Sequence, residues 1–256
     1  MHGLVVQLQV IHALIMREIK TRFGTHRLGY VWALVEPSLW ILTFAGLYWL
    51  MGRLSPPGMD VVPFIATGIV PFLLFRGTSS SNVSAIASNK GLLFYPRIRP
   101  LDLAIARTIL EFATCVMVFV VLLGAYVLLT GHSKFESSLK ILLGLGLAAG
   151  LGAGVGMSFA GLSVFAQVFE RLHNPLIRPL FWTSAVFYPL NAVPSSARDL
   201  LLYNPLVHAV ELVRDGWFTG YHSRYINAWY PGLWTLGLLF LGLTVERAAR
   251  RRLQLS

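Results

Sequence analysis

Residues 113–129 read ATCVMVFVVLLGAYVLL, a run that contains no charged side chain. It lies inside a longer apolar segment, 103–129, that is long enough as an α-helix to cross a hydrocarbon layer of about 30 Å. Other segments of this kind occur on both sides of it. The sequence therefore predicts an all-α, polytopic membrane protein with six transmembrane helices, at 31–52, 62–82, 103–129, 139–167, 174–192 and 229–246.

The composition supports this fold class. Of the 256 residues 55% are hydrophobic and only 12% are charged, and the mean hydropathy is +0.65. Soluble domains carry about 25% charged residues. An outer-membrane barrel would show short alternating segments, which the sequence lacks. The lone Cys115 excludes an internal disulfide. We interpret residues 1–256 as a single transmembrane domain.

The distribution of cations indicates an orientation. With both termini on the inner side, most of the 21 Lys and Arg residues fall in inner segments, as cytoplasmic loops of membrane proteins require. We predict that both termini are cytoplasmic. The net charge of +10 is then explained by these loops, and we predict no nucleic-acid partner. The domain divides into residues 1–30, spans one to five at 31–192, an outer segment at 193–227, and span six with a basic tail at 228–256.

The N-terminal segment mixes apolar and polar residues. Leu8, Ile11, Ile15 and Ile19 recur at helical spacing within residues 4–22. This pattern is typical of an amphipathic helix in the plane of the membrane interface, or of a helix packed against its own bundle. Both alternatives stay open. A block rich in Arg and Lys, REIKTRFGTHRLGY at 17–30, follows directly before the first span.

The outer segment contains an apolar stretch that cannot cross a membrane. LLLYNPLVHAVELV at 200–213 is too short, and Pro205 interrupts it. We expect a pair of short helices that re-enter the membrane from the outer side. Glu211 and Asp215 stand one helical turn apart. They are either paired carboxylates or, with Arg214 beside them, part of an outer helix face.

The fourth span is rich in glycine. Gly146, Gly150 and Gly154 recur every four residues, and Gly152 and Gly156 form a second pair. Small residues at this spacing let helix backbones approach closely. The pattern predicts tight helix packing, within the chain or at a subunit contact.

Catalytic motifs are absent from the sequence. It contains no GxxxxGK[ST], no HExxH, no paired CxxC and no GxSxG. We predict no catalytic residue, no metal site and no cofactor in this chain, and hence a protein that is not an enzyme.

Four ionisable residues lie in or beside the spans, where charge is costly and marks functional positions. They are Glu36, Arg76, Arg107 and Glu111. We expect Glu111 to pair with Arg76 or Arg107, and Glu36 to pair with an arginine of the basic block. The cluster either lines a hydrated route or neutralises buried charge.

Aromatic residues are dense in spans one and five. Trp40, Phe44 and Tyr48 form a stripe on one helix face, and Trp182 and Tyr188 lie near the fifth span. They are either core and interfacial residues or a surface along which sugar rings slide.

Four segments, in this order, resemble one family. RE-IKTRFGTHRLGYVWALVEPSLW, GIVPFLLF, NKGLLFYPRIRPLD and YNPLVHAVELVRDGWFTGY resemble membrane permease subunits of type-two ABC exporters for polysaccharides. The capsular polysaccharide exporters of Gram-negative bacteria are the most similar in spacing. The resemblance covers nearly the whole chain.

The resemblance implies a homodimer in the bacterial inner membrane, with each subunit bound to a cytoplasmic ATPase that carries ATP and Mg. It implies an interface helix at 6–22, a gating helix at 25–33, a coupling helix at 84–99 and periplasmic gate helices at 195–226. The implied substrate is a lipid-linked acidic capsular polysaccharide. Periplasmic adaptor and outer-membrane export proteins are further expected partners.

Candidate residues follow from these roles. The substrate entrance would use Arg17, Lys20, Arg22 and Arg27. ATPase coupling would use Asn89, Lys90, Tyr95, Arg97 and Arg99. The periplasmic gate would use Asn204, Pro205, His208, Glu211 and Arg214.

Two other functions stay open. The same architecture exports O-antigen, teichoic acid or other lipid-linked glycans. A membrane-embedded glycan acyltransferase would instead need a convergent histidine site, whereas His26 and His208 are expected on opposite sides of the membrane.

Overall fold

The computed structural model describes residues 2–23, 28–52, 58–92, 98–131 and 135–253, and this part of the chain contains helices but no strand. The all-α prediction is confirmed. In chain order the elements are α1 (His2–Phe23), α2 (Leu28–Leu50), α3 (Val61–Val83), α4 (Ala85–Ser88), η1 (Lys90–Leu92), α5 (Pro100–Thr130), α6 (Ser138–Phe165), α7 (Val168–Thr183), η2 (Leu190–Ala192), α8 (Ser195–Leu201), α9 (Pro205–Trp217) and α10 (Trp229–Leu253).

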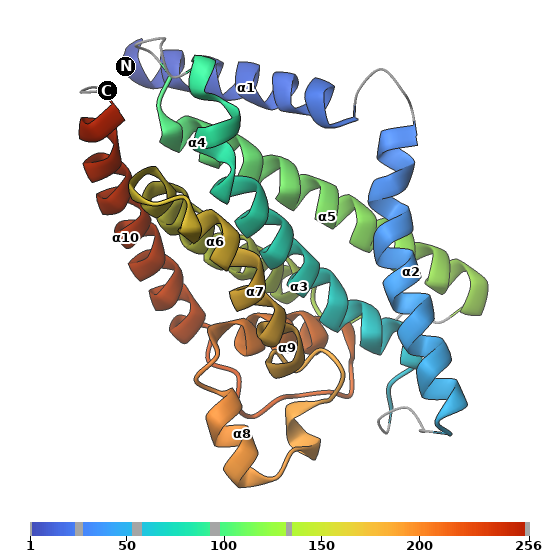
Figure 1. Cartoon of the computed structure of the whole chain (residues 1–256). Coiled ribbons are helices and arrows are strands. Elements are labelled where there is room, and N and C mark those ends of the chain that lie inside the picture. Colours follow the sequence, from blue (N-terminus) through green and yellow to red (C-terminus); the bar gives the residue numbers. More distant parts are fainter. Residues whose placement is uncertain (1, 24–27, 53–57, 93–97, 132–134, 254–256) are drawn as a thin grey trace.

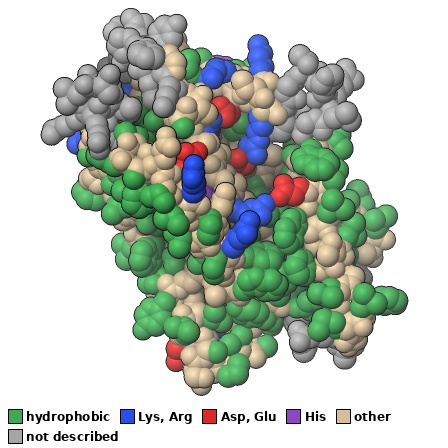
Figure 2. Space-filling view, in the orientation of Figure 1, with side chains coloured by type: hydrophobic (Ala, Val, Ile, Leu, Met, Phe, Trp, Pro, Cys, Tyr) green, Lys and Arg blue, Asp and Glu red, His purple; other side chains and the backbone are tan. Residues whose placement is uncertain are grey.

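Within the described residues, four helices are long and apolar enough to cross a membrane, so the chain is a multi-pass membrane protein. They are Val31–Leu50 of α2, then α3, α5 and α6. Their bounds lie close to the predicted spans. Figure 2 shows the expected surface for such a bundle, because hydrophobic side chains cover most of the lower half of this face.

The predicted fifth span, 174–192, is wrong in its bounds. Helix α7 begins at Val168 and ends at Thr183, and it is only 16 residues long. The chain leaves the helix just beyond it, where Ala185 adopts a left-handed backbone conformation with φ of 55°. The carbonyl oxygens of Ala185 and Val186 then accept hydrogen bonds from Arg214 of α9 instead of continuing a helix.

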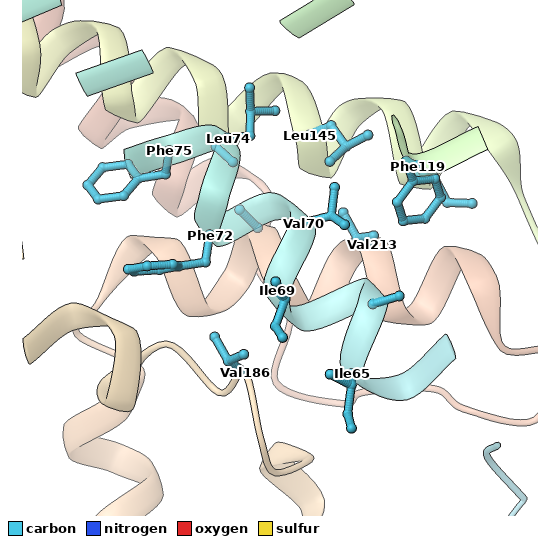
Figure 3. Close-up of a cluster of buried hydrophobic side chains, with 14 of the residues drawn as sticks. Ile65, Ile69, Val70, Phe72, Leu74, Phe75, Phe119, Leu145, Val186 and Val213 are labelled. Atoms are coloured by element: carbon cyan, nitrogen blue, oxygen red, sulfur yellow. The ribbon is translucent and has the colours of Figure 1, made fainter. Parts of the chain in front are cut away.

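Helix α3 forms the centre of the bundle. In its apolar window 72% of the residues are buried, against 11% in α2 and 17% in α5. Ile65 and Ile69 of α3 belong to a buried cluster that also includes Phe119 of α5, Leu145 of α6 and Val186 from beyond α7 (Figure 3). Because protein covers α3 on most sides, the helix needs apolar residues all round.

Glycines of α6 bring this helix close to α3. A Cβ atom at Gly152 would lie 2.5 Å from the carbonyl oxygen of Phe75, and one at Gly156 would lie 2.6 Å from that of Ser79. Both distances are too short for a side chain, so only glycine permits this backbone approach.

Another face of α6 packs against α10 in the same way. A Cβ atom at Gly150 would lie 2.6 Å from Thr235, and one at Gly154 would lie 2.6 Å from Leu238. Gly146 faces no atom within 4 Å. The predicted close packing is therefore found within the chain, where it joins α6 to both α3 and α10.

The two ends of the bundle carry different elements. Helix α1 lies across one end, near the last turns of α10, and α8 and α9 lie at the opposite end (Figure 1). The outer segment thus contains the expected two short helices. Asn204 starts α9 because its side-chain oxygen accepts a hydrogen bond from Leu206 N–H at 3.0 Å, and Pro205 occupies the first helical position.

Helix α9 is buried, which corrects the interpretation of Glu211 and Asp215 as an outer helix face. Glu211 and Arg214 are 0% exposed, and Arg214 Nη1 lies 2.5 Å from Glu211 Oε1. The two carboxylates do not act as a pair: Asp215 binds Lys140 Nζ of α6 at 2.8 Å. Packing of α9 against α3 and α6 explains the burial.

Two helices expected from the resemblance differ in form. Residues 28–33 belong to the continuous helix α2, and the remainder of the expected gating helix lies outside the described residues. The expected coupling helix at 84–99 is interrupted. Helix α4 ends at Ser88. The next residue, Asn89, donates from its side chain to the carbonyl oxygen of Ala85 at 3.0 Å, and the short η1 turn follows. Such side-chain bonds to backbone compete with helix continuation.

Candidate functional site

A cavity of about 1010 Å³ lies where α1, α2, α3, α5 and α7 meet. Its charged lining residues are Glu18, Arg22, Arg76, Arg107, Glu111 and Arg178. Its aromatic lining residues are Trp40, Phe44, Phe72, Phe181 and Trp182. On the face shown in Figure 2, side chains of both charges gather in the upper half around a hollow. The cavity thus unites members of three separately predicted groups: the entrance, the intramembrane charges and the aromatic stripe.

Helix α1 closes one side of this cavity because it is fixed to α5 and α4. Gln7 donates to Asp102 at 3.0 Å, and Arg17 donates to Asn89 at 2.8 Å. Leu14 is buried against α4 and α5. Of the two alternatives for this segment, packing against the bundle is therefore observed. The opposite face of α1 still exposes apolar residues, namely Val5, Val6, Leu8 and Met16.

Two ion pairs hold the C-terminal end of α1 at the cavity. Glu18 lies 2.9 Å from Arg107, and Arg22 Nη1 lies 2.6 Å from Glu111 Oε1. The second Arg22 nitrogen reaches the other Glu111 oxygen at 3.3 Å, so this contact is bidentate. Gly77 of α3 leaves room for the carboxylate, since a Cβ atom there would lie 3.3 Å from Glu111 Oε2.

These contacts correct the predicted charge pairing. Glu111 pairs with an arginine of the basic block rather than with Arg76 or Arg107, and Arg76 pairs with Glu36 at 2.7 Å. The expected partners are therefore exchanged between the two glutamates. The cause is the position of α1, which brings Arg22 to α5 and leaves Glu36 of α2 facing α3.

The cavity carries an excess of positive charge among its lining residues. Its lining includes four arginines and two glutamates. Arg178 on α7 is exposed and has no carboxylate within ion-pair distance among the described residues. It is therefore the cavity guanidinium that is open to an incoming anion.

The aromatic wall is continuous across three elements. Trp40 and Phe44 are stacked with centroids 5.8 Å apart, Phe181 lies 5.4 Å from Trp40, and Phe72 lies 4.9 Å from Phe181. Trp182 extends the wall at 5.4 Å from Phe181. Phe72 was not among the predicted aromatic residues. Its place in the wall follows from the approach of α3 to α7, which the helical spacing within one segment does not encode.

Two predicted aromatic residues lie outside this lining. Tyr48 donates a hydrogen bond to the carbonyl oxygen of Phe187, and Tyr188 donates to that of Trp182 at 2.9 Å. Both hydroxyls therefore stabilise the turn after α7.

The remaining entrance residues lie apart from the cavity or beyond the described chain. Arg17 is bound to Asn89, and Lys20 is exposed but does not line the cavity. Arg27 lies outside the described residues. Of the four predicted entrance cations, the cavity contains Arg22.

Of the predicted coupling residues, Asn89 lies at the end of the bundle that carries α1, because Arg17 of α1 donates to its side chain at 2.8 Å. Asn89 is only 3% exposed and its amide is bonded within the chain, so it is not a surface contact. Arg99 is exposed at the start of α5, where its N–H donates to Asp102 at 3.0 Å. The side chains of Lys90, Tyr95 and Arg97 are outside the described part of the structure.

The predicted gate residues form a buried network at the opposite end. His208 Nε2 lies 3.0 Å from the carbonyl oxygen of Leu202, and Nδ1 accepts the N–H of Asn227 at 3.3 Å. Burial lowers the pKa of His208 from its ordinary value. The neutral imidazole thus ties both flanking loops to α9.

Asn204 and Arg214 connect this network to the turn after α7. The Asn204 amide donates to Ser184 Oγ at 3.0 Å. The Arg214 guanidinium lies 4.3 Å from the ring centroid of Phe64. Glu211 accepts hydrogen bonds from both Arg214 and Tyr221. The network therefore fixes α9 to the turn after α7.

The chemistry of the cavity suits an amphiphilic anionic ligand. Guanidinium groups bind carboxylate or phosphate oxygens, and aromatic faces pack against apolar C–H surfaces. The fold and the cavity together define a polytopic helical membrane protein with a charged and aromatic cavity between its helices.

The chain belongs to the ABC-2 type transporter family, whose model matches residues 9–218. It is 33% identical over 245 residues to the polysialic acid transport protein KpsM of Escherichia coli, covering 96% of this chain and 95% of that protein. Identity is 31% to the capsule polysaccharide export inner-membrane protein CtrC of Neisseria meningitidis and 27% to BexB of Haemophilus influenzae, and each match covers 96% of this chain and 92% of the relative. The resemblance found in the sequence is confirmed.

Proposed function

We propose that this protein is the membrane-spanning permease subunit of an ATP-driven exporter that moves lipid-linked acidic capsular polysaccharide across the inner membrane. The names of its relatives support the substrate class, since they are a polysialic acid transport protein and capsule polysaccharide export proteins. The observation that carries the proposal in this chain is the cavity of about 1010 Å³, whose lining combines arginines with aromatic residues.

In this function the chain crosses the membrane six times, through α2, α3, α5, α6, α7 and α10, with both termini in the cytoplasm. The common end of α1 and the last turns of α10 supports an even number of crossings (Figure 1). Helices α8 and α9 at the opposite end re-enter the membrane from the periplasm. Burial of α9 supports this arrangement, because irregular backbone at membrane depth needs a protein cover.

The cavity receives the lipid-linked glycan from the inner leaflet. Arg178, and then the other cavity arginines, bind its phosphate and acidic sugars through bidentate contacts. The rings of Trp40, Phe44 and Trp182 carry the sugar faces onward without requiring one register. Stacking of this kind tolerates movement of a polymer because it depends on a face rather than on directed hydrogen bonds.

Energy comes from a separate ATPase that holds ATP and Mg, which agrees with the missing phosphate-binding loop. Two permease copies form a homodimer, and the end that carries α4, η1 and Arg99 faces the ATPase. Periplasmic adaptor and outer-membrane proteins receive the glycan.

A reconstituted transport assay tests this function. Proteoliposomes contain the permease and its cognate ATPase, and the measured quantity is ATP-dependent movement of a lipid-linked acidic glycan. We expect Arg178→Gln to reduce transport about tenfold or more, because a hydrogen-bonded charge contact is lost. The matched control is Arg224→Gln, an exposed arginine of the outer segment that does not line the cavity.

Unchanged transport by Arg178→Gln, in protein that assembles normally, would contradict the cavity route. If a neutral O-antigen-type glycan were transported as fast as the acidic glycan, the result would favour an exporter of O-antigen or another lipid-linked glycan. Glycan modification by the permease without its ATPase would favour an acyltransferase.

A further inference from the structure

Four charged residues surround a second, smaller pocket beside the cavity. This pocket of about 130 Å³ is lined by Arg22, Glu36, Arg76 and Glu111. Arg22 pairs with Glu111 at 2.6 Å, and Arg76 pairs with Glu36 at 2.7 Å. Three of the four residues also line the main cavity, so these arginines face the proposed substrate route while a carboxylate of the chain already binds them.

We propose that Glu36 and Glu111 are internal competitors for the anionic group of the substrate. In the empty protein they occupy the guanidinium groups of Arg76 and Arg22, and an acidic substrate enters by displacing them. This inference rests on the proposed function, and it adds a regulatory step to the same site. Arg178, which has no described carboxylate partner, provides the first contact for the anion before the exchange.

The exposure of the pairs makes the exchange feasible. The side chains of Arg76 and Glu36 are 39% and 47% exposed, and that of Arg22 is 41% exposed. The Arg76–Glu36 pair is therefore weak, since both partners are readily solvated, whereas the Glu111 side chain is only 11% exposed and holds Arg22 more firmly. A displaced Glu36 carboxylate therefore returns to water at little cost. A phosphate group gains by the exchange because it offers more acceptor oxygens to the same guanidinium fork.

The exchange also changes contacts between helices. The Arg22–Glu111 pair joins α1 to α5, and the Arg76–Glu36 pair joins α2 to α3. An anion that replaces either glutamate breaks one of these links at the edge of the cavity. Neutral glycans cannot compete for the arginines, so the same pairs select for acidic substrates.

Charge-removing variants of the glutamates test the competition. Full-length protein in detergent is titrated at low salt with two anionic probes, a trimer of sialic acid and dihexanoyl phosphatidic acid. We expect Glu36→Gln to lower the Kd of a bound probe about threefold to fivefold, the scale of one exposed ion pair, and Glu111→Gln to lower the Kd as well. Zwitterionic dihexanoyl phosphatidylcholine should show no change.

Asp60→Asn is the matched control, because Asp60 is an acidic residue that binds Tyr126 at 2.8 Å and lines neither pocket. Its Kd values should equal those of the unchanged protein. The two probes identify the source of the anion: tightening for the trimer indicates the glycan, and tightening for phosphatidic acid alone indicates the lipid headgroup. Each glutamate is tested singly, so misfolding of one variant leaves the other informative.

A positioning role for the glutamates predicts the opposite sign. If Glu36 and Glu111 only orient the arginines, both variants bind the probes more weakly, and that result would overturn the competition. Unchanged Kd values in both variants would overturn it too. Failure of the proposed function is distinguishable, because the unchanged protein would then bind neither anionic probe and Arg178→Gln would have no effect.

Discussion

Arg214 shows how one buried cation can determine a local fold. Its guanidinium binds Glu211 and the carbonyl oxygens of Ala185 and Val186, and its side chain is 0% exposed. Arg214→Gln leaves the Glu211 carboxylate buried without its cation. We expect a loss of about 3–5 kcal/mol in the free energy of unfolding, measured by thermal or denaturant unfolding in detergent.

Arg224→Gln is the control for this prediction, since Arg224 is exposed in the same outer segment. Arg214→Lys should recover only part of the loss, because an ammonium group cannot reproduce the planar fork. Equal unfolding free energies for Arg214→Gln and the control would show that the network does not stabilise the protein.

Sequence reasoning identified the charged residues near the cavity but not their partners. Glu36, Arg76 and Glu111 were singled out because charge is rare inside spans. Their pairing depends on where α1 lies, and helical periodicity within a segment carries no information about its docking site. Arg178 was not among the predicted site residues, since its position on the cavity wall follows from the approach of α7 to α3.

The predicted helix bounds agree with the observed ones where the amino-acid composition changes sharply at the end of an apolar segment. Helix α5 begins at Pro100 and ends before Gly131, whose φ of 73° is a left-handed cap. The predicted end of the fifth span was wrong, because the apolar residues after Thr183 form a turn instead of continuing α7. Arg214 stabilises this turn by a hydrogen bond to the carbonyl oxygen of Ala185. A tertiary contact therefore overrode a local hydrophobic signal.

The glycines of α6 give a prediction for helix packing. Gly152→Ala places a Cβ atom 2.5 Å from the Phe75 carbonyl oxygen, so α6 and α3 must separate. We expect a loss of about 1–3 kcal/mol in the free energy of unfolding, as in other overpacked cores. Gly146→Ala is the matched control on the same helix, because it faces no atom within 4 Å. It should be neutral or slightly stabilising, since alanine favours helix.

Unfolding curves of the two variants in the same detergent measure this difference. If Gly152→Ala were as stable as Gly146→Ala, the close α3–α6 approach would not contribute to stability.

The outer helix α9 gives a prediction for pH dependence. Burial lowers the pKa of His208, so the unfolded chain binds a proton at a higher pH than the folded chain does. Below the ordinary histidine pKa of about 6.5, folding stability should therefore fall as the pH decreases toward the lowered value. Protonation also places an N–H opposite the N–H of Asn227, which disrupts that contact.

Thermal unfolding between pH 7.5 and pH 5 measures the effect. His208→Gln removes the titrating group, and the variant should lose less stability over this interval than the unchanged protein loses. An equal loss in both proteins would assign the pH dependence to other groups.

At the scale of the whole molecule, the helical class and family were accessible from the sequence because apolar runs and ordered motifs extend over most of the chain. The cavity was not accessible in this way, because five helices contribute to it and their relative placement is a property of the assembled bundle. The structure also shows which elements lie at each end of the bundle. Helix α1 and the last turns of α10 lie at one end, and α8 and α9 lie at the other (Figure 1).

The proposed orientation of these two ends is testable by cysteine labelling. The native thiol is removed as Cys115→Ala, and single cysteines are placed at exposed positions as Ala13→Cys on α1 and Ala197→Cys on α8. A membrane-impermeant maleimide is added to spheroplasts. We expect labelling of Ala197→Cys in intact spheroplasts and of Ala13→Cys only after lysis, because cytoplasmic termini place α1 inside and α8 outside. The reverse pattern would overturn the orientation and with it the direction of export, while labelling of both sites before lysis would contradict a membrane between the two ends.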